Sequence, residues 1–189
     1  MSAIQASLVK EVSHALDQST QKAANLEDDL ELQEFISYFR KKFGDQVIAV
    51  IFFGSCLSTI TKKETSFRDF FVILDSYKTT GSILTRAFHH ILPPDLYHLE
   101  LTMPHGGSAE CKYYLLSLDH LIRATSPHAK DLYVMGRLSK QVACVYAKNE
   151  SAKLLVARCL ASAADTVVRY VSALIAKPME RDAIFRLIL

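Results

Sequence analysis

The chain has 189 residues, half of them hydrophobic, which suits one globular domain of ordinary size and excludes a disordered chain. Its formal net charge of +2 is too close to neutral to indicate a nucleic-acid partner. The four cysteines include no CxxC pair, which argues against a zinc site or a disulfide framework and favours free thiols.

The N-terminal region predicts two amphipathic helices. Apolar residues four apart predict a helix over 3–17, and a second apolar stripe predicts a helix over 32–43 that Gly44 ends as a C-cap. Charged residues interrupt the first helix, so we expect no secretory signal peptide. The first arginine is Arg40 and an acidic run precedes it, so a mitochondrial transit peptide also fits poorly.

Two buried strands follow these helices. Residues 47–53 form a short, continuous, β-branched apolar run, typical of a strand buried on both faces, and it ends at Gly54-Ser55. A polar loop over 59–68 leads to a second apolar run at 69–74, which predicts the next strand.

The middle of the chain predicts a hairpin and a further strand. A short helix over 83–91 stops at a Pro-Pro pair. Strands are predicted at 96–103 and 110–117, and the turn residues Pro104-His105-Gly106-Gly107 between them indicate a hairpin. Helical stretches flank Pro127, and 141–147 is the last strand candidate.

The C-terminal region is helical. A long helix is predicted from about Ser151 to Lys177, where Pro178 ends it, and another begins at Met179. Charged residues interrupt the long apolar stretch, so we expect no membrane-spanning helix. The fold class is therefore α+β, a small mixed β-sheet flanked by helices, with a domain over 1–148 and a helical C-terminal segment over 149–189. The last helix has no cap, and we expect the chain to be truncated there.

A buried strand that ends in Gly54-Ser55 can receive a phosphate group. Glycine lets the backbone approach a ligand closely, and the N–H groups that follow can point at phosphate oxygens. The Ser55 hydroxyl can donate one more hydrogen bond. Because Gly-Ser after a strand is common, an ordinary strand-to-helix turn is the better explanation without a second signal.

Asp69 is that second signal. It begins an apolar strand, where a carboxylate is costly unless it is capped or bound to a cation. Gly-Ser, a gap of about a dozen residues and then Asp-x-Asp/Glu is the pattern of the nucleotidyltransferase superfamily, in which carboxylates hold the Mg²⁺ that bridges triphosphate oxygens. The gap here suits that pattern, but Phe71 stands where the second carboxylate is usual.

A second metal ligand must then come from elsewhere. Asp75 lies six residues on, about 20 Å along an extended strand, and is expected to be a strand-end or turn residue. Glu100, in the strand predicted to neighbour Asp69, is the better partner for the metal. Residues His98 and Glu100 share a face there, and a solvated strand face is the competing interpretation of Glu100.

Three motifs carry a resemblance to the mitochondrial-type phosphatidate cytidylyltransferases, also called the translocator assembly and maintenance family. Phe52-Phe53-Gly54-Ser55 with residues 68–75 is similar to the family's Asp-Phe-x-Phe strand and its second aspartate. Residues 111–117 resemble its Ile-Lys-Tyr-Gly-Val segment, with Tyr114 in place of glycine. The third and most specific match is residues 131–142, similar to Leu-Tyr-x-Ala-Gly-Arg-Leu-x-Lys-Pro-Val, with Gln141 in place of proline.

The resemblance implies a nucleotidyltransferase-like fold and an Mg²⁺-dependent enzyme of phospholipid and cardiolipin biosynthesis. Enzymes of that family join CTP to phosphatidic acid, giving CDP-diacylglycerol and pyrophosphate. In that scheme Gly54 and Ser55 cradle phosphates, Asp69 holds the metal, and Lys112 meets a phosphate or stabilises the charge of the transition state. Arg137 and Lys140, neighbours if their helix persists, bind the triphosphate or the lipid head group.

Alternatives remain for the function and for the site. The chain could be another nucleotidyltransferase acting on a small molecule, protein or RNA, or a non-catalytic relative that binds nucleotide. Lys112 could also extend from a strand face to solvent, and Arg137 with Lys140 could be a solvated helix end. A lipid substrate implies peripheral contact with a membrane. We expect a bacterial cytoplasmic protein at the inner membrane, with the mitochondrial matrix side as the alternative.

Overall fold

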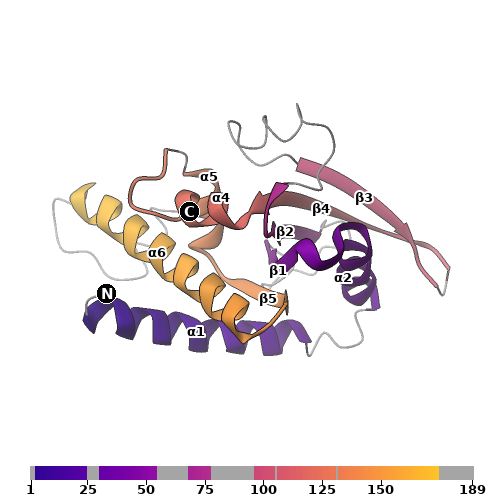
Figure 1. The fold of residues 1–189 in the computed structure, drawn as a ribbon, viewed down its shortest axis with the longest axis horizontal. Helices are drawn as coiled ribbons and strands as arrows, with labels where there is room; N and C mark the ends of the chain where they lie inside the picture. The colour runs from indigo at the N-terminus through magenta and orange to yellow at the C-terminus, as the bar shows by residue number, and fades with distance from the viewer. Residues whose placement is uncertain are drawn as a thin grey trace.

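A computed structural model describes residues 3–24, 30–54, 68–77, 96–104, 106–130 and 132–174 of the chain (Figure 1). Ser55, the predicted loop at 59–67 and the predicted helices at 83–91 and from Met179 lie outside these residues. The elements, in chain order, are α1 (Ala3–Ala24), α2 (Leu30–Phe43), the short 3-10 helix η1 (Gly44–Gln46), β1 (Val47–Phe53), β2 (Arg68–Leu74), β3 (Leu96–Thr102), β4 (Ser108–Ser117), α4 (Leu118–Ala124), α5 (Tyr133–Leu138), β5 (Val142–Ala147) and α6 (Glu150–Leu174).

The strands form one five-stranded mixed sheet in the order β3-β4-β2-β1-β5. β2 and β4 are parallel, whereas the other neighbouring pairs are antiparallel. The α+β class and the mixed sheet predicted from the sequence are therefore confirmed. The predicted hairpin is also present, because β3 pairs directly with β4 and the Met103 N–H donates to the Gly107 carbonyl at 3.1 Å.

Helices cover both faces of the sheet, which explains why β1 and β2 are continuously apolar. On one face, Phe53 stacks on Phe71 with ring centroids 4.5 Å apart, and the surrounding cluster includes residues of α1, α4, α5 and α6. On the other face, Phe70 packs edge-on against Phe39 of α2 at 5.6 Å. Neighbouring residues of β2 thus enter two different cores.

The long helix α6 belongs to the same packed structure as the sheet. Its residues Val156, Ala157 and Leu160 are buried in the cluster that contains Phe53 and Phe71. Figure 1 shows α6 running at an angle to α1, and the two helices contact each other. Within the described ranges, no helix has both the length and the apolar character needed to cross a membrane.

Candidate functional site

The site begins where β1 ends, at Gly54. This residue has φ +99°, a backbone conformation that residues other than glycine rarely adopt. A Cβ placed on Gly54 would lie 3.0 Å from Oδ2 of Asp69, closer than ordinary packing permits. Position 54 therefore needs glycine for two reasons, its backbone angle and the carboxylate that lies against its Cα.

Lys112 lies beside Asp69 because of the strand register. In the parallel pairing of β2 with β4, Asp69 is aligned with Lys112, and on the other side of β2 the antiparallel β1 aligns it with Phe53. Aligned residues on neighbouring strands project from the same face of a sheet. Both charged side chains are half-buried and project from the face that carries Phe53 and Phe71.

Arg137 approaches the same face from α5. Its guanidinium carbon lies 6.0 Å from the ring centroid of Phe53 and 5.4 Å from that of Tyr133. Helix α5 ends at Leu138, so Lys140 lies beyond the helix, exposed, and the helical adjacency on which its pairing with Arg137 depended is absent. The structure thus brings Arg137 near Asp69 and Lys112, and the role of Lys140 stays a prediction.

The pKa of Asp69 reports this environment. Burial raises the pKa of its carboxyl group above the ordinary value of 3.8, and the positive charges of Lys112 and then Arg137 oppose that rise without cancelling it. The carboxylate is therefore held where ionisation is costly and two cations partly offset the cost. Such perturbation beside a specific charge partner is a recognised mark of functional sites.

The prediction that the strand of Glu100 neighbours that of Asp69 is wrong, because β4 lies between β3 and β2. Glu100 lies on the same face of the sheet as Asp69 but at a distance. It is exposed on the edge strand β3, opposite Glu110 of β4, whereas Asp69 is aligned with Lys112, which in turn faces His98. Two strand spacings and two residues of offset separate the Cα atoms of Glu100 and Asp69 by about 12 Å. Its role as a metal ligand stays a prediction, and the register argues against one ion shared with Asp69 in this arrangement.

The predicted face assignment of β3 is confirmed by its burial pattern, which alternates exposed and half-buried residues along the strand. His98 and Glu100 are exposed, and Leu99 and Leu101 pack on the opposite face of the sheet. Nε2 of His98 lies 2.9 Å from a carboxylate oxygen of Glu110. The row of ionisable groups that begins at Asp69 and Lys112 therefore continues to the edge of the sheet.

The residues fit a magnesium ion only if the ion arrives with phosphate. The described part of the chain contains no group of three or more His, Cys, Asp or Glu residues able to hold a metal. Mg²⁺, however, is commonly bound by one or two carboxylates together with substrate phosphates and water. Asp69 suits that mode as one carboxylate ligand, and the cations Lys112 and Arg137 suit the phosphates.

Two tyrosines that the sequence analysis did not assign to the site also belong to it. The Tyr133 hydroxyl donates a hydrogen bond of 2.6 Å to the Tyr114 hydroxyl, and Tyr133 also lies under Arg137. Asp69 and Arg137 both influence the pKa of Tyr114, which burial raises well above its ordinary value. Spacing could have indicated both, since Tyr114 is two residues from Lys112 on a strand and Tyr133 is four residues from Arg137 on a helix.

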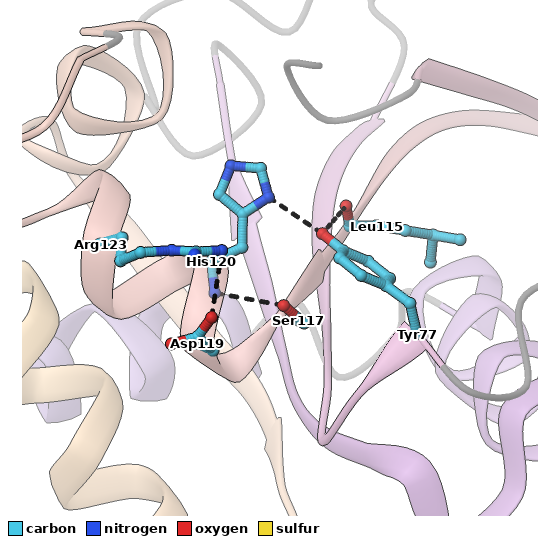
Figure 2. Close-up of polar contacts among 6 residues, drawn as sticks. All are labelled: Tyr77, Leu115, Ser117, Asp119, His120 and Arg123. Atoms are coloured by element: carbon cyan, nitrogen blue, oxygen red, sulfur yellow. Dashed lines mark hydrogen bonds and ion pairs between the residues drawn. The ribbon is translucent and has the colours of Figure 1, made fainter. Parts of the chain in front are cut away.

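A second polar cluster lies at the other ends of β2 and β4. Figure 2 shows the Tyr77 side chain reaching towards His120, with 3.0 Å between the Tyr77 hydroxyl and Nδ1 of His120. The same hydroxyl lies 3.5 Å from the Leu115 carbonyl oxygen, and the His120 N–H donates to the Ser117 hydroxyl, which caps α4. These contacts join the chain after β2 to the start of α4, so we interpret them as structural.

A surface groove between α1 and α6 is also separate from Asp69. It is lined by Leu8, Val9, Pro127, Arg158, Ala161, Ser162 and Asp165. None of these residues belongs to the strands or to the helix that carry the candidate site. The groove is therefore not part of the candidate site at Asp69.

A scan of the chain against protein-family models and a search of curated proteins both find no match. The resemblance to the phosphatidate cytidylyltransferases consequently rests on the motif residues themselves. Of those residues, Gly54, Asp69, Lys112 and Arg137 gather at one end of β1 and β2.

Proposed function

We propose that the chain is a nucleotidyltransferase that transfers CMP from CTP to phosphatidic acid, releasing pyrophosphate and forming CDP-diacylglycerol. The observation that carries this proposal is the convergence of a glycine at positive φ, a half-buried carboxylate and two cations on one sheet face. Phosphoryl and nucleotidyl transfer depend mainly on positioning and on charge stabilisation, and this set of groups suits both.

Each residue has a defined part in the proposed reaction. An oxygen of the phosphatidate phosphate attacks the α-phosphorus of CTP, and the bond from that phosphorus to the oxygen of the β-phosphate breaks as pyrophosphate leaves. Gly54 and Ser55 receive the β and γ phosphates, because glycine lets the backbone approach them closely. Lys112 stabilises the negative charge that develops during transfer.

Magnesium would be held by Asp69 and by phosphate oxygens, and when bound it supplies charge neutralisation on the triphosphate. Asp69 is suited to this because its burial makes an unpaired negative charge costly, so a cation restores the favourable ionised form. The nucleotidyltransferase-like fold, peripheral membrane contact and the lipid acceptor all belong to this proposal.

The test is transfer from CTP labelled at the α-phosphate, with Mg²⁺ and vesicles that contain phosphatidic acid. The proposal expects labelled CDP-diacylglycerol, which is absent when the vesicles contain only phosphatidylcholine and absent with the Asp69→Asn variant. Label on a protein, RNA or small-molecule acceptor, with none on lipid, would replace it with a different nucleotidyltransferase. Binding of CTP without any transfer would indicate a non-catalytic nucleotide-binding protein.

A further inference from the structure

Arg137 is held between two aromatic rings. Phe53 comes from β1 and Tyr133 from the helix that carries Arg137, one helical turn earlier. A guanidinium group stacks favourably on such rings, and each contact removes some of the freedom of a long side chain that is otherwise exposed. The position of Arg137 therefore depends on the position of Tyr133.

Tyr133 is in turn tied to the sheet. Its hydroxyl donates to that of Tyr114 at 2.6 Å, and the two ring centroids are 5.7 Å apart. Tyr114 is buried on β4 and packs against Phe71 at 5.3 Å and against Phe53 at 6.1 Å. The hydrogen bond thus connects the helix that carries Arg137 to the strand that carries Lys112.

Tyr114 is protected from losing the proton that its phenol carries. Burial, the contact with Tyr133 and the negative charge of Asp69 all raise the Tyr114 pKa, and Arg137 opposes them only in part. The Tyr114 hydroxyl therefore keeps its proton across the physiological range. Tyr114 stands where the resembled family has glycine, so this link is a feature of this chain that the resemblance does not imply.

We infer that Tyr133, fixed by its hydroxyl contact with Tyr114, is a positioning residue that directs Arg137 to the nucleotide triphosphate and not to the lipid acceptor. The direction follows from Phe53, which contacts Arg137 and immediately precedes Gly54. This inference rests on the proposed function, because it assumes that phosphates are received at Gly54.

The experiment measures CTP binding to the whole chain with Mg²⁺ by calorimetry, together with the KM for CTP and the KM for phosphatidic acid. Tyr133→Leu removes both the ring and the hydroxyl, and is expected to weaken CTP binding about 10-fold, on the scale of a lost cation–π contact. Tyr133→Phe keeps the ring but loses the hydroxyl contact, and is expected to weaken CTP binding only about 3-fold. The KM for phosphatidic acid is expected to stay unchanged in both variants.

A matched control comes from a second arginine–tyrosine contact. Arg40 lies 5.1 Å from the ring centroid of Tyr146. Tyr146 is on the edge strand β5, which β1 separates from the strand of Asp69, so Tyr146→Leu should leave CTP binding unchanged. Tyr114→Phe, which keeps the buried ring, tests the hydrogen bond without removing packing, and is expected to weaken CTP binding about 3-fold.

A double variant decides between positioning and general loosening. If Tyr133 acts through Arg137, Tyr133→Leu combined with Arg137→Gln binds CTP no more weakly than Arg137→Gln alone. Additive losses, or normal CTP binding by Tyr133→Leu, overturn the inference. A wild-type chain that binds CTP but makes no CDP-diacylglycerol removes the lipid part of the proposed function and leaves the binding data to decide this inference. A wild-type chain that binds no CTP overturns both.

Discussion

The carboxylate of Asp69 occupies the space that a side chain on residue 54 would need, since Oδ2 lies 3.0 Å from the position of a Cβ on Gly54. Gly54→Ala is therefore expected to lower the free energy of unfolding by about 1–3 kcal/mol, through strain at positive φ, and to displace Asp69. Gly44→Ala is the matched control, because Gly44 also has positive φ, at +56°, but a Cβ there meets nothing within 4 Å. Urea unfolding and transfer activity should show destabilisation in both variants and loss of activity in Gly54→Ala alone.

Asp69→Asn should abolish turnover and stabilise the fold. The folded pKa of Asp69 is raised above 3.8, so its contribution to stability is complete below about pH 3.8 and is lost as the pH rises through the raised value. Asparagine is neutral at every pH and keeps that contribution at pH 7. We expect transfer to fall more than about 100-fold and stability at pH 7 to rise.

Urea unfolding at pH 7 and at pH 4 checks this prediction, because the stability gain should shrink at the lower pH. Asp75→Asn is the control, since Asp75 is exposed in the turn after β2. A variant at Asp69 that retains transfer activity would show that this carboxylate is not the metal ligand.

Lys112→Gln should lower kcat by about 100-fold, because it removes a preorganised positive charge beside the reacting phosphates. It should also move the acidic limb of the pH–activity profile to higher pH, since Lys112 lowers the pKa of Asp69 more than Arg137 does. Lys130→Gln, an exposed lysine between α4 and α5, should leave both quantities unchanged. An unmoved acidic limb in Lys112→Gln would separate Lys112 from Asp69.

Three thiols should resist alkylation in the native protein. Cys111, Cys144 and Cys159 are buried and free, and burial raises the pKa of Cys111 to about 12 and that of Cys144 to about 11. Since the thiolate is the reactive form, we expect iodoacetamide at pH 8 to modify these three at least about 100-fold more slowly than in 8 M urea. Peptide mapping by mass spectrometry identifies each site, and rapid native labelling of Cys111 would contradict its buried position.

The sequence predicted the strands of this fold well because buried strands are continuous apolar runs. Residues 47–53 match β1, and 69–74 match β2 except for one residue at its start. The length of α1 was underestimated, since the helix continues to Ala24 beyond the apolar stripe that predicted 3–17. Periodicity cannot detect a helix end where polar residues remain compatible with helix.

The site was predictable only as far as its motifs. Asp69 and Lys112 could be named from the chain, but their alignment requires the parallel pairing of β2 with β4, which no local pattern specifies. Register also decides the place of Glu100, two strands from Asp69. The contact of Tyr133 with Tyr114 is tertiary, and spacing along the chain gives only the face on which each ring lies.

The parallel pairing of β2 with β4 has a consequence for how the protein folds. Antiparallel neighbours can pair through a short turn, but parallel strands need a long crossover, which here contains β3 and its hairpin turn. Closing such a long loop costs conformational entropy before its contacts form. The antiparallel pairs β1 with β2 and β3 with β4 can therefore each form before the two units join. Asp69 and Lys112 come from different units. Their charge pair therefore forms only when the two units join, and a nascent chain holds a complete candidate site only after that step.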